Sequence, residues 1–168
     1  PMPSRVQIVP DVTPPRTPDA YGVHDERHGR LLNHYDIDGT STLRIPAGSH
    51  RAVVSRGYEY EILEARVTAG ATTTVAASLA RSVDTTGYLC GDFHVHTYYS
   101  VDSGDTPELK IAGLVSEGIE LPLFSDHEWI SNPQTTVVAL GLDDQVTGLI
   151  SSELTTFEYG HFGLVPLE

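Results

Sequence analysis

The amino-acid sequence predicts an α+β protein, with an antiparallel β-sandwich in residues 21–86 and alternating strands and helices in residues 88–168. The first part contains short segments in which polar and apolar side chains alternate, separated by turn residues. The second part alternates short apolar runs with segments that carry helix-capping residues. With 168 residues, of which 39% are hydrophobic, the chain is long enough to bury one or two small cores.

Residues 1–20 are predicted to form an irregular arm, because four prolines lie between positions 10 and 18. After the arm, residues 58–62 and 72–79 show the two-residue period of strands that bury one face. Residues 36–39 (Asp-Ile-Asp-Gly) resemble the start of a calcium loop, but no acidic residue follows at EF-hand spacing. We therefore predict a hairpin turn at this position, without an ion.

The second part contains signals for two helices. Asp105 or Thr106 can cap the first helix, Pro107 suits its first position, and Gly118 suits its end. The second helix is predicted over residues 132–140, although several of its residues are β-branched and favour strands. Strand-like runs surround the two helices, at residues 87–91, 121–124, 149–150 and 162–165. This alternation indicates βα units and a mostly parallel sheet.

The composition and the absence of certain motifs argue against several classes of function. The net charge is −13, and the ten Lys and Arg residues form no run, which argues against a nucleic-acid partner. No apolar run approaches the length of a membrane span, and no signal peptide is visible, so we expect a soluble protein of unknown compartment. Export after removal of a signal peptide is left open. The sequence also lacks a Gly-x-Ser-x-Gly elbow, a phosphate-binding glycine loop and a Cys-x-x-Cys pair.

The segment 92–97 (Asp-Phe-His-Val-His-Thr) places two histidines one residue apart, directly after a strand-like run. In an extended segment, residues two apart point to the same face, so His94 and His96 are predicted to present their rings side by side. Imidazole nitrogen is a common ligand of Zn, Mn and Fe. The pair alone is half a metal site, or else one buried and one solvated histidine.

Further nitrogen and oxygen donors follow at the margins of the downstream strand-like runs. Parallel sheets place functional groups at the carboxyl ends of their strands, so these donors are expected to meet the histidine pair. Mixed nitrogen and oxygen sets suit divalent ions. The predicted metal ligands are His94, His96, Asp102, His127, Glu153 and His161. The remaining histidines (His24, His28, His34 and His50) are predicted to be solvated surface residues.

The motifs resemble those of the PHP (polymerase and histidinol phosphatase) metal-dependent hydrolases. Residues 92–97 are similar to the first motif of that family, residues 125–128 (Ser-Asp-His-Glu) to the second, and residues 152–156 with 160–162 to the third. The form of the motifs is most similar to the CehA/McbA-type branch, which includes carbamate and phosphate ester hydrolases. In that branch a carboxypeptidase-regulatory-like module often precedes the PHP part, and residues 36–48 are similar to such a module.

The resemblance implies a distorted (β/α)7 barrel, of which residues 88–168 have room for only three or four strands. We therefore expect the front part of a longer hydrolase. Its open barrel edge is expected to be covered by a further C-terminal part, by another chain in an oligomer, or by the sandwich.

The resemblance also implies roles for the site residues. Two or three divalent ions (Zn, Mn or Fe) are bound, Glu153 bridges two of them, and a hydroxide between the metals attacks a small-molecule phosphoester, ester or carbamate. Glu153 and Asp126 are the expected catalytic residues. Asp126 and also Asp92 are expected to orient ligand histidines by accepting hydrogen bonds from their rings, or else to cap strand ends. Tyr98 and Tyr99 line the substrate entry or pack against the sandwich. The alternative function is a non-catalytic metal-binding or interaction module.

Overall fold

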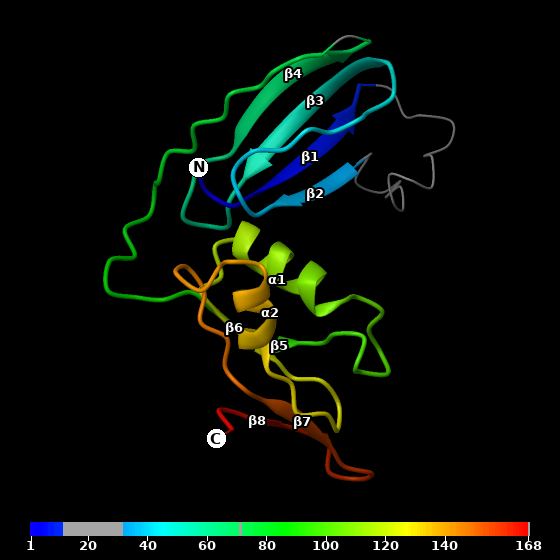
Figure 1. The fold of residues 1–168 in the computed structure, drawn as a ribbon, viewed down its shortest axis with the longest axis vertical. Helices are drawn as coiled ribbons and strands as arrows, with labels where there is room; N and C mark the ends of the chain where they lie inside the picture. Colours follow the sequence, from blue (N-terminus) through cyan, green and yellow to red (C-terminus); the bar gives the residue numbers. More distant parts are fainter. Residues whose placement is uncertain (12–31, 71, 168) are drawn as a thin grey trace. The chain divides into compact units, whose positions relative to one another are not determined.

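The computed structural model describes residues 1–11, 32–70 and 72–167, and the chain divides into two compact units, Pro1–Asp84 and Thr85–Glu168 (Figure 1). The elements described in the first unit are all strands, and the two helices that the structure describes both belong to the second. The fold therefore mixes strands and helices as the α+β prediction requires, with the helices confined to the part where capping signals occur.

The first unit is built on a four-stranded antiparallel sheet in the order β2-β1-β3-β4. The strands are β1 (Ser4–Pro10), β2 (Leu32–Asp36), β3 (Gly48–Ser55) and β4 (Leu63–Ala69). Ile8, Ala52 and Val67 pack together on one face, and Leu43 and Ile45 cover them. The predicted antiparallel pairing is therefore present. The described residues of this unit form one sheet, whereas a sandwich requires two.

Strand β1 departs from the predicted irregular arm. It lies between β2 and β3, and its residue Ile8 is buried. The prolines mislead here because the strand ends at Pro10, which occupies a position where a missing N–H is tolerated. Residues 12–20 of the predicted arm lie outside the described residues.

The predicted strand at residues 72–79 is wrong, because none of these residues lies in a strand of the structure. Its alternation consists of Thr, Ala and Ser with Val75 and Leu79, so one face offers little apolar area to bury. The Thr73 hydroxyl donates to the Thr68 carbonyl at 3.1 Å, and just after the stretch the Glu61 N–H donates to the Ala80 carbonyl at 2.8 Å.

A turn follows Asp36 as predicted, but it is not a hairpin turn, because β1 lies between β2 and β3 in the sheet. The Asp36 carboxylate accepts hydrogen bonds from the backbone N–H groups of Asp38 (3.1 Å) and Gly39 (2.9 Å), and Gly39 adopts a positive φ of 79°. Burial raises the pKa of Asp36, but these hydrogen bonds and one from the Ser41 hydroxyl offset it and hold the pKa below its ordinary value. The acidic turn is stabilised by the chain itself.

The second unit contains β5 (Gly91–Val95), α1 (Pro107–Ser116), β6 (Leu121–Phe124), α2 (Pro133–Ala139), β7 (Ser152–Thr155) and β8 (His161–Leu164). Strands β5 and β6 pair in parallel. Parallel bridges from Leu123 to Leu149 and from His127 to Glu153 continue the sheet to a third segment. The carboxyl ends of these three segments therefore lie along the same edge, as the alternation of strands and helices predicts.

Both predicted helices form, and each begins where its capping residue indicates. The Thr106 hydroxyl accepts from the Leu109 N–H at 3.3 Å, and the Asn132 side chain accepts from the Gln134 N–H at 3.1 Å. A proline occupies the first turn of each helix. The β-branched residues of α2 are tolerated because one of them, Val137, is fully buried.

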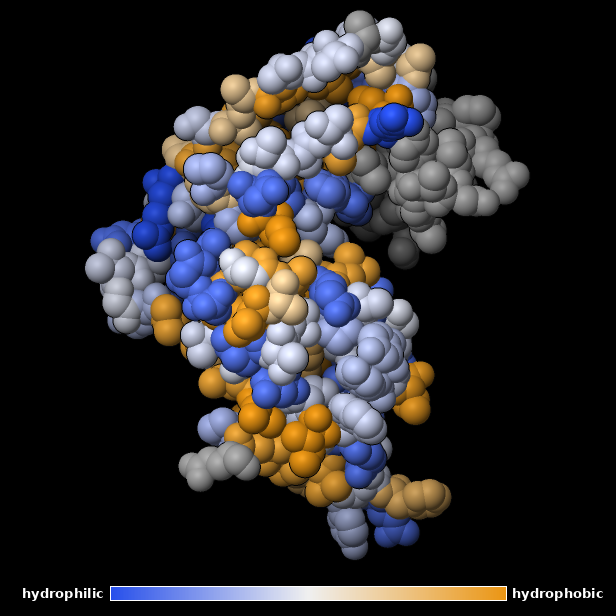
Figure 2. All heavy atoms as spheres, in the orientation of Figure 1, coloured by the Kyte–Doolittle hydropathy of each residue, from blue (hydrophilic) through white to orange (hydrophobic). Residues whose placement is uncertain are grey.

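Two features of the second unit differ from the prediction. Residues 87–90 precede β5 and are not part of it, so the strand begins later than the apolar run indicates. Strands β7 and β8 form an antiparallel hairpin, because only a short turn joins them. Figure 2 shows hydrophobic side chains gathered in the region of this hairpin. Leu154 and Phe162, which pair across it, are both partly exposed. In the part of the chain that the structure describes, neither helix is long and apolar enough to cross a membrane.

Gly148 fixes the approach of the third parallel segment to the start of α2. Its N–H donates to the Gln134 side chain at 2.7 Å, and an added Cβ would lie 2.6 Å from the Gln134 backbone nitrogen. We expect Gly148→Ala to lower the free energy of unfolding by about 1–3 kcal/mol, because backbone must move. Urea unfolding measures the loss. Gly104→Ala is the control, since nothing lies within 4 Å of its Cβ position, and an equal loss in both variants contradicts the explanation.

Candidate metal centre

The six predicted ligands meet at the carboxyl edge of the parallel segments. His94 lies in β5, and His96 follows the strand by one residue. His127 follows β6, and Glu153 and His161 lie in β7 and β8. Asp102 comes from the loop between β5 and α1. Residues that are far apart in the sequence are therefore brought together by strand order.

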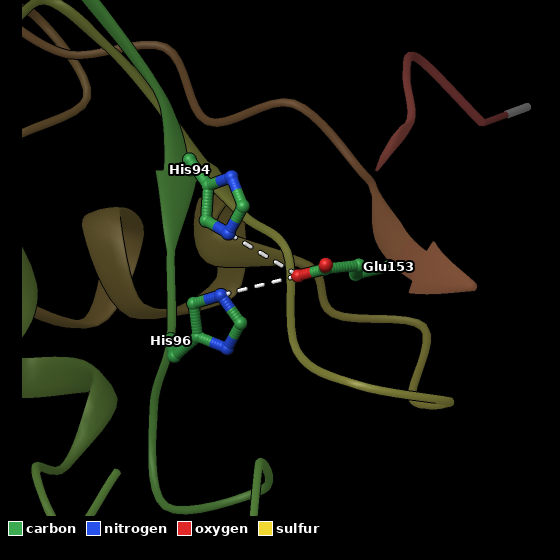
Figure 3. Close-up of side chains that lie close together, drawn as sticks. All are labelled: His94, His96 and Glu153. Atoms are coloured by element: carbon green, nitrogen blue, oxygen red, sulfur yellow. Dashed lines mark ion pairs between the residues drawn. The ribbon is translucent and has the colours of Figure 1, made fainter. Parts of the chain in front are cut away.

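Glu153 is the centre of this cluster and is only 1% exposed. Its Oε2 atom lies 3.2 Å from Nε2 of His94 and 3.2 Å from Nε2 of His96 (Figure 3). Its Oε1 atom lies 2.7 Å from Nδ1 of His161, and Nδ1 of His127 is 3.8 Å from Oε2. The two histidines of the 92–97 motif present their rings on the same face, with centroids 4.9 Å apart. This is the arrangement predicted from their spacing.

Neither oxygen of the Glu153 carboxylate accepts a hydrogen bond, although four imidazole rings surround it. The ring nitrogens are close to the oxygens but are not aligned to donate to them. A buried carboxylate without partners is costly, and it is retained where a cation completes the site. The donor set of imidazoles and carboxylates suits Zn, Mn or Fe. The residues present therefore fit a divalent metal centre.

The potential ligand atoms form three overlapping groups, in each of which all atoms lie within 4.8 Å of one another. The groups are His94, His96 and Glu153; His96, Asp102 and His127; and His127, Glu153 and His161. Neutral imidazole offers one nitrogen as a ligand and carries a proton on the other. The middle group shares both of its histidines with the outer groups, whereas the outer groups share only Glu153.

Asp102 and Ser100 hold the rings of two of these histidines. Asp102 Oδ1 lies 3.2 Å from His96 Nδ1, and Oδ2 lies 3.4 Å from His127 Nε2. A hydrogen bond from the Ser100 hydroxyl, together with the nearby His96 and His127, lowers the pKa of Asp102 below its usual range. Ser100 Oγ also lies 3.0 Å from His96 Nδ1 and accepts from the His127 backbone N–H. No pattern in the sequence predicts this role of Ser100.

The hydrogen bonds of the Asp126 carboxylate go to Thr97 and Ser131 and not to a histidine ring, which favours the second expected role, at a strand end. Asp126 is fully buried, and its carboxylate accepts hydrogen bonds from the Thr97 N–H (2.6 Å), the Thr97 hydroxyl and the Ser131 hydroxyl. Asp92 likewise accepts from the His94 backbone N–H at 3.1 Å instead of from a ring. Both carboxylates therefore organise the backbone that carries the ligands.

Glu128 and Thr155 join the second and third ligand-bearing segments, and no sequence pattern predicts either role. Glu128 has a φ of 53°, a conformation that residues other than glycine rarely adopt. Its N–H donates to the Glu153 carbonyl at 2.9 Å, and its carboxylate accepts from the Thr155 N–H at 2.5 Å. The Thr155 hydroxyl lies 2.5 Å from His127 Nδ1. Unusual backbone conformations of this kind cluster at active sites and at segments that bind ligands.

We expect Glu128→Ala to weaken metal binding by about threefold to tenfold, because one exposed hydrogen bond between the His127 and Glu153 segments is lost. Glu128→Gln keeps an acceptor oxygen and is expected to bind metal nearly as tightly as the wild type. Competition with a chelating dye for Zn²⁺ measures both. Equal affinities for the alanine variant and the wild type contradict the proposed link.

Of the remaining histidines, the structure describes His34 and His50, and neither belongs to the three ligand groups. His34 lies half-buried in β2, and His24 and His28 lie outside the described residues. His50 was predicted to be solvated, but it is 4% exposed, and its Nε2 lies 2.8 Å from the Pro46 carbonyl oxygen.

Comparison with protein-family models, with curated proteins and with solved structures finds no match to this chain. The resemblance to the PHP hydrolases therefore rests on the motif residues alone. The geometry around Glu153 stands independently of that resemblance.

Proposed function

We propose that the chain is a metal-dependent hydrolase of phosphoester bonds, or of related ester or carbamate bonds. The observation that carries this proposal is the buried Glu153 carboxylate, whose two oxygens have no hydrogen-bond donor among the four histidines around it. Such a carboxylate can give one oxygen to each of two ions. Pairs of ions about 3.5–4 Å apart are typical of phosphatases and nucleases.

We further propose that two ions are held, by the two outer groups of ligands. His94 and His96 face Oε2 of Glu153, and His161 faces Oε1. His127 completes the second group. One nitrogen of His96 and of His127 faces Glu153 and the other faces Asp102, so an ion in the middle group together with ions in both outer groups would need both nitrogens of each ring. Asp102 is therefore better suited to accept hydrogen bonds from the ring nitrogens that face away from Glu153.

Divalent ions in such a site lower the pKa of water and polarise the oxygen of a bound ester. The protein residues hold the ligand rings in place: Asp102 and Ser100 orient His96 and His127, and Asp126 ties the end of β5 to the end of β6 through Thr97. The net charge of −13 does not exclude an anionic substrate, because bound cations reverse the sign of the field at the site.

For the fold of this chain we propose a sandwich module followed by part of a (β/α)7 barrel of the PHP type. The parallel pairing of β5, β6 and the segment around Leu149 supports the barrel, and the antiparallel sheet of β1 to β4 supports the module. In a barrel of this kind the ligands come from the carboxyl ends of successive strands, as His94, His96 and His127 do, whereas His161 comes from the amino end of the antiparallel strand β8.

The test has two steps. Elemental analysis of protein purified without chelator is expected to give two divalent ions per chain, and absence of metal contradicts the proposal. The Mn²⁺-loaded protein is then expected to hydrolyse p-nitrophenyl phosphate, and His94→Ala, which removes a ligand but leaves the buried centre in place, is expected to lose this activity.

The alternative is a non-catalytic metal-binding module. It is favoured by β8, which carries His161 and is exposed along its whole length, as expected of a hairpin that a metal holds in place. Two bound ions without hydrolysis of any phosphate ester, carboxylic ester or carbamate would support this alternative.

A further inference from the structure

Five large apolar side chains are exposed on the two loops that carry His96, Asp102 and His127. They are Tyr98 (48% exposed), Tyr99 (43%), Val101 (96%), Trp129 (50%) and Ile130 (68%). Single exposed apolar residues are common on protein surfaces, whereas a group of them beside polar residues marks a binding site. We call the three rings of Tyr98, Tyr99 and Trp129 the aromatic rim.

The aromatic rim is a packed arrangement that joins the two loops. The rings of Tyr99 and Trp129 stack nearly in parallel, with an interplanar angle of 7° and centroids 5.1 Å apart. Tyr98 lies against Tyr99 at 4.3 Å, and their hydroxyl groups share a hydrogen bond of 2.9 Å. About half of each side chain remains exposed, so the rim keeps free ring surface for a further planar group.

The rim is also close to the metal centre along both loops. Trp129 follows His127 by two residues, which limits the distance between their Cα atoms to about 7 Å. Tyr98 and Tyr99 lie between His96 and Asp102, and Ser100 in the same loop accepts a hydrogen bond from the His127 N–H. The rim and the metal centre are therefore carried by the same two loops.

We propose that the aromatic rim binds a planar aromatic group of the substrate, which makes the substrate an aryl ester and, in the phosphate case, an aryl phosphate. This inference rests on the proposed hydrolase function. Charge complementarity places the anionic phosphate at the cationic centre and the uncharged ring on the rim. Water then adds its oxygen to phosphorus, the bond from phosphorus to the aryl oxygen breaks, and the phenol leaves with a proton from the water.

Trp129 makes the binding step directly measurable, because it is the only tryptophan in the chain. Phenylphosphonate, which is not hydrolysed, is expected to change Trp129 fluorescence in Zn²⁺-loaded protein in a saturable way. Methylphosphonate is expected to leave the fluorescence nearly unchanged. Calorimetry is expected to give an affinity about threefold to tenfold higher for phenylphosphonate, the usual gain from one aromatic contact.

The matched variants separate the rim from the remainder of the unit. Tyr99→Leu is expected to abolish the preference for phenylphosphonate while leaving methylphosphonate affinity and metal content unchanged. Tyr88→Leu is the control, because Tyr88 is also exposed but precedes β5, at the opposite end of the strand from the ligands. A Tyr99→Leu variant that keeps the full preference overturns the inference.

Hydrolysis distinguishes failure of this inference from failure of the proposed function. Turnover of phenyl phosphate and methyl phosphate with a ratio of kcat/KM that Tyr99→Leu does not alter leaves the hydrolase intact and refutes the aromatic subsite. Selective binding of phenylphosphonate without turnover of either ester supports the subsite and refutes the hydrolase.

Discussion

Replacing Glu153 with glutamine is expected to reduce bound metal from two ions per chain to fewer than one. The carboxylate belongs to both outer ligand groups and faces His94 and His96 with one oxygen and His161 with the other. Glutamine has almost the same volume but carries no charge and only one acceptor oxygen. Both ions therefore lose a ligand in one substitution, and elemental analysis of the purified variant measures the result.

The effect of Glu153→Gln on the free energy of unfolding is expected to have opposite signs in the metal-free and in the metal-loaded protein. Without metal, Glu153→Gln is expected to raise the free energy of unfolding by about 1–3 kcal/mol, because a buried charge without a partner is removed. With Zn²⁺ in excess, the wild type is expected to be the more stable, because it gains the binding free energy. Thermal unfolding with and without chelator measures both signs.

Glu158→Gln is the control for both experiments, because Glu158 is exposed on the turn between β7 and β8. It is expected to change neither metal content nor stability. If Glu153→Gln destabilises the metal-free protein, the carboxylate has partners within the fold, and the argument for a cation at its oxygens fails.

The local signals of the second unit were sufficient to predict its helices and its ligand cluster. Thr106 and Asn132 are recognisable as caps because each is a short polar residue directly before a proline, and its side chain can accept a hydrogen bond from a free backbone N–H of the first helical turn. The six ligand candidates lie together because each follows or lies within a strand of a sheet whose order follows the sequence. Periodicity and chain order thus carry most of the information about the site.

Residues that act through the backbone were not predictable from the sequence. Glu128 has a positive φ and links two ligand segments by hydrogen bonds that depend on the tertiary register of β6 and β7. The wrong prediction of an irregular arm at β1 has a similar origin. The position of β1 in the middle of the sheet depends on pairing with two strands that follow it in the chain. Prolines nearby outweighed the alternation of Val6 and Ile8 in the prediction.

The position of Asp126 explains why its carboxylate bonds to Thr97 and Ser131 and not to the ring of a ligand histidine. It is adjacent to His127, so a hydrogen bond to a ligand ring was the natural expectation. In an extended segment, however, neighbouring side chains point to opposite faces, and Asp126 points into the core while His127 points to the metal centre. The carboxylate therefore binds the Thr97 backbone next to His96 and holds the two histidine-bearing loops together.

Asp126→Ala is expected to lower the free energy of unfolding by about 3–5 kcal/mol and to weaken metal binding by about 10- to 100-fold. The variant leaves the Thr97 N–H and the hydroxyl groups of Thr97 and Ser131 buried without their acceptor. Urea unfolding followed by Trp129 fluorescence measures the loss, since that residue lies in the same unit.

Two comparisons separate this structural role from a catalytic one. Asp126→Asn keeps one acceptor oxygen for the Thr97 N–H, so it is expected to lose less stability than the alanine variant and to retain most of the metal affinity. Asp144→Ala removes an exposed carboxylate of the same unit and is expected to change stability by less than about 0.5 kcal/mol. Loss of hydrolysis in Asp126→Ala at unchanged stability and metal content would instead place the carboxylate in the chemistry. The hydrogen bonds oppose that outcome, because each oxygen of Asp126 is engaged by Thr97 and Oδ2 also by Ser131 in a fully buried position.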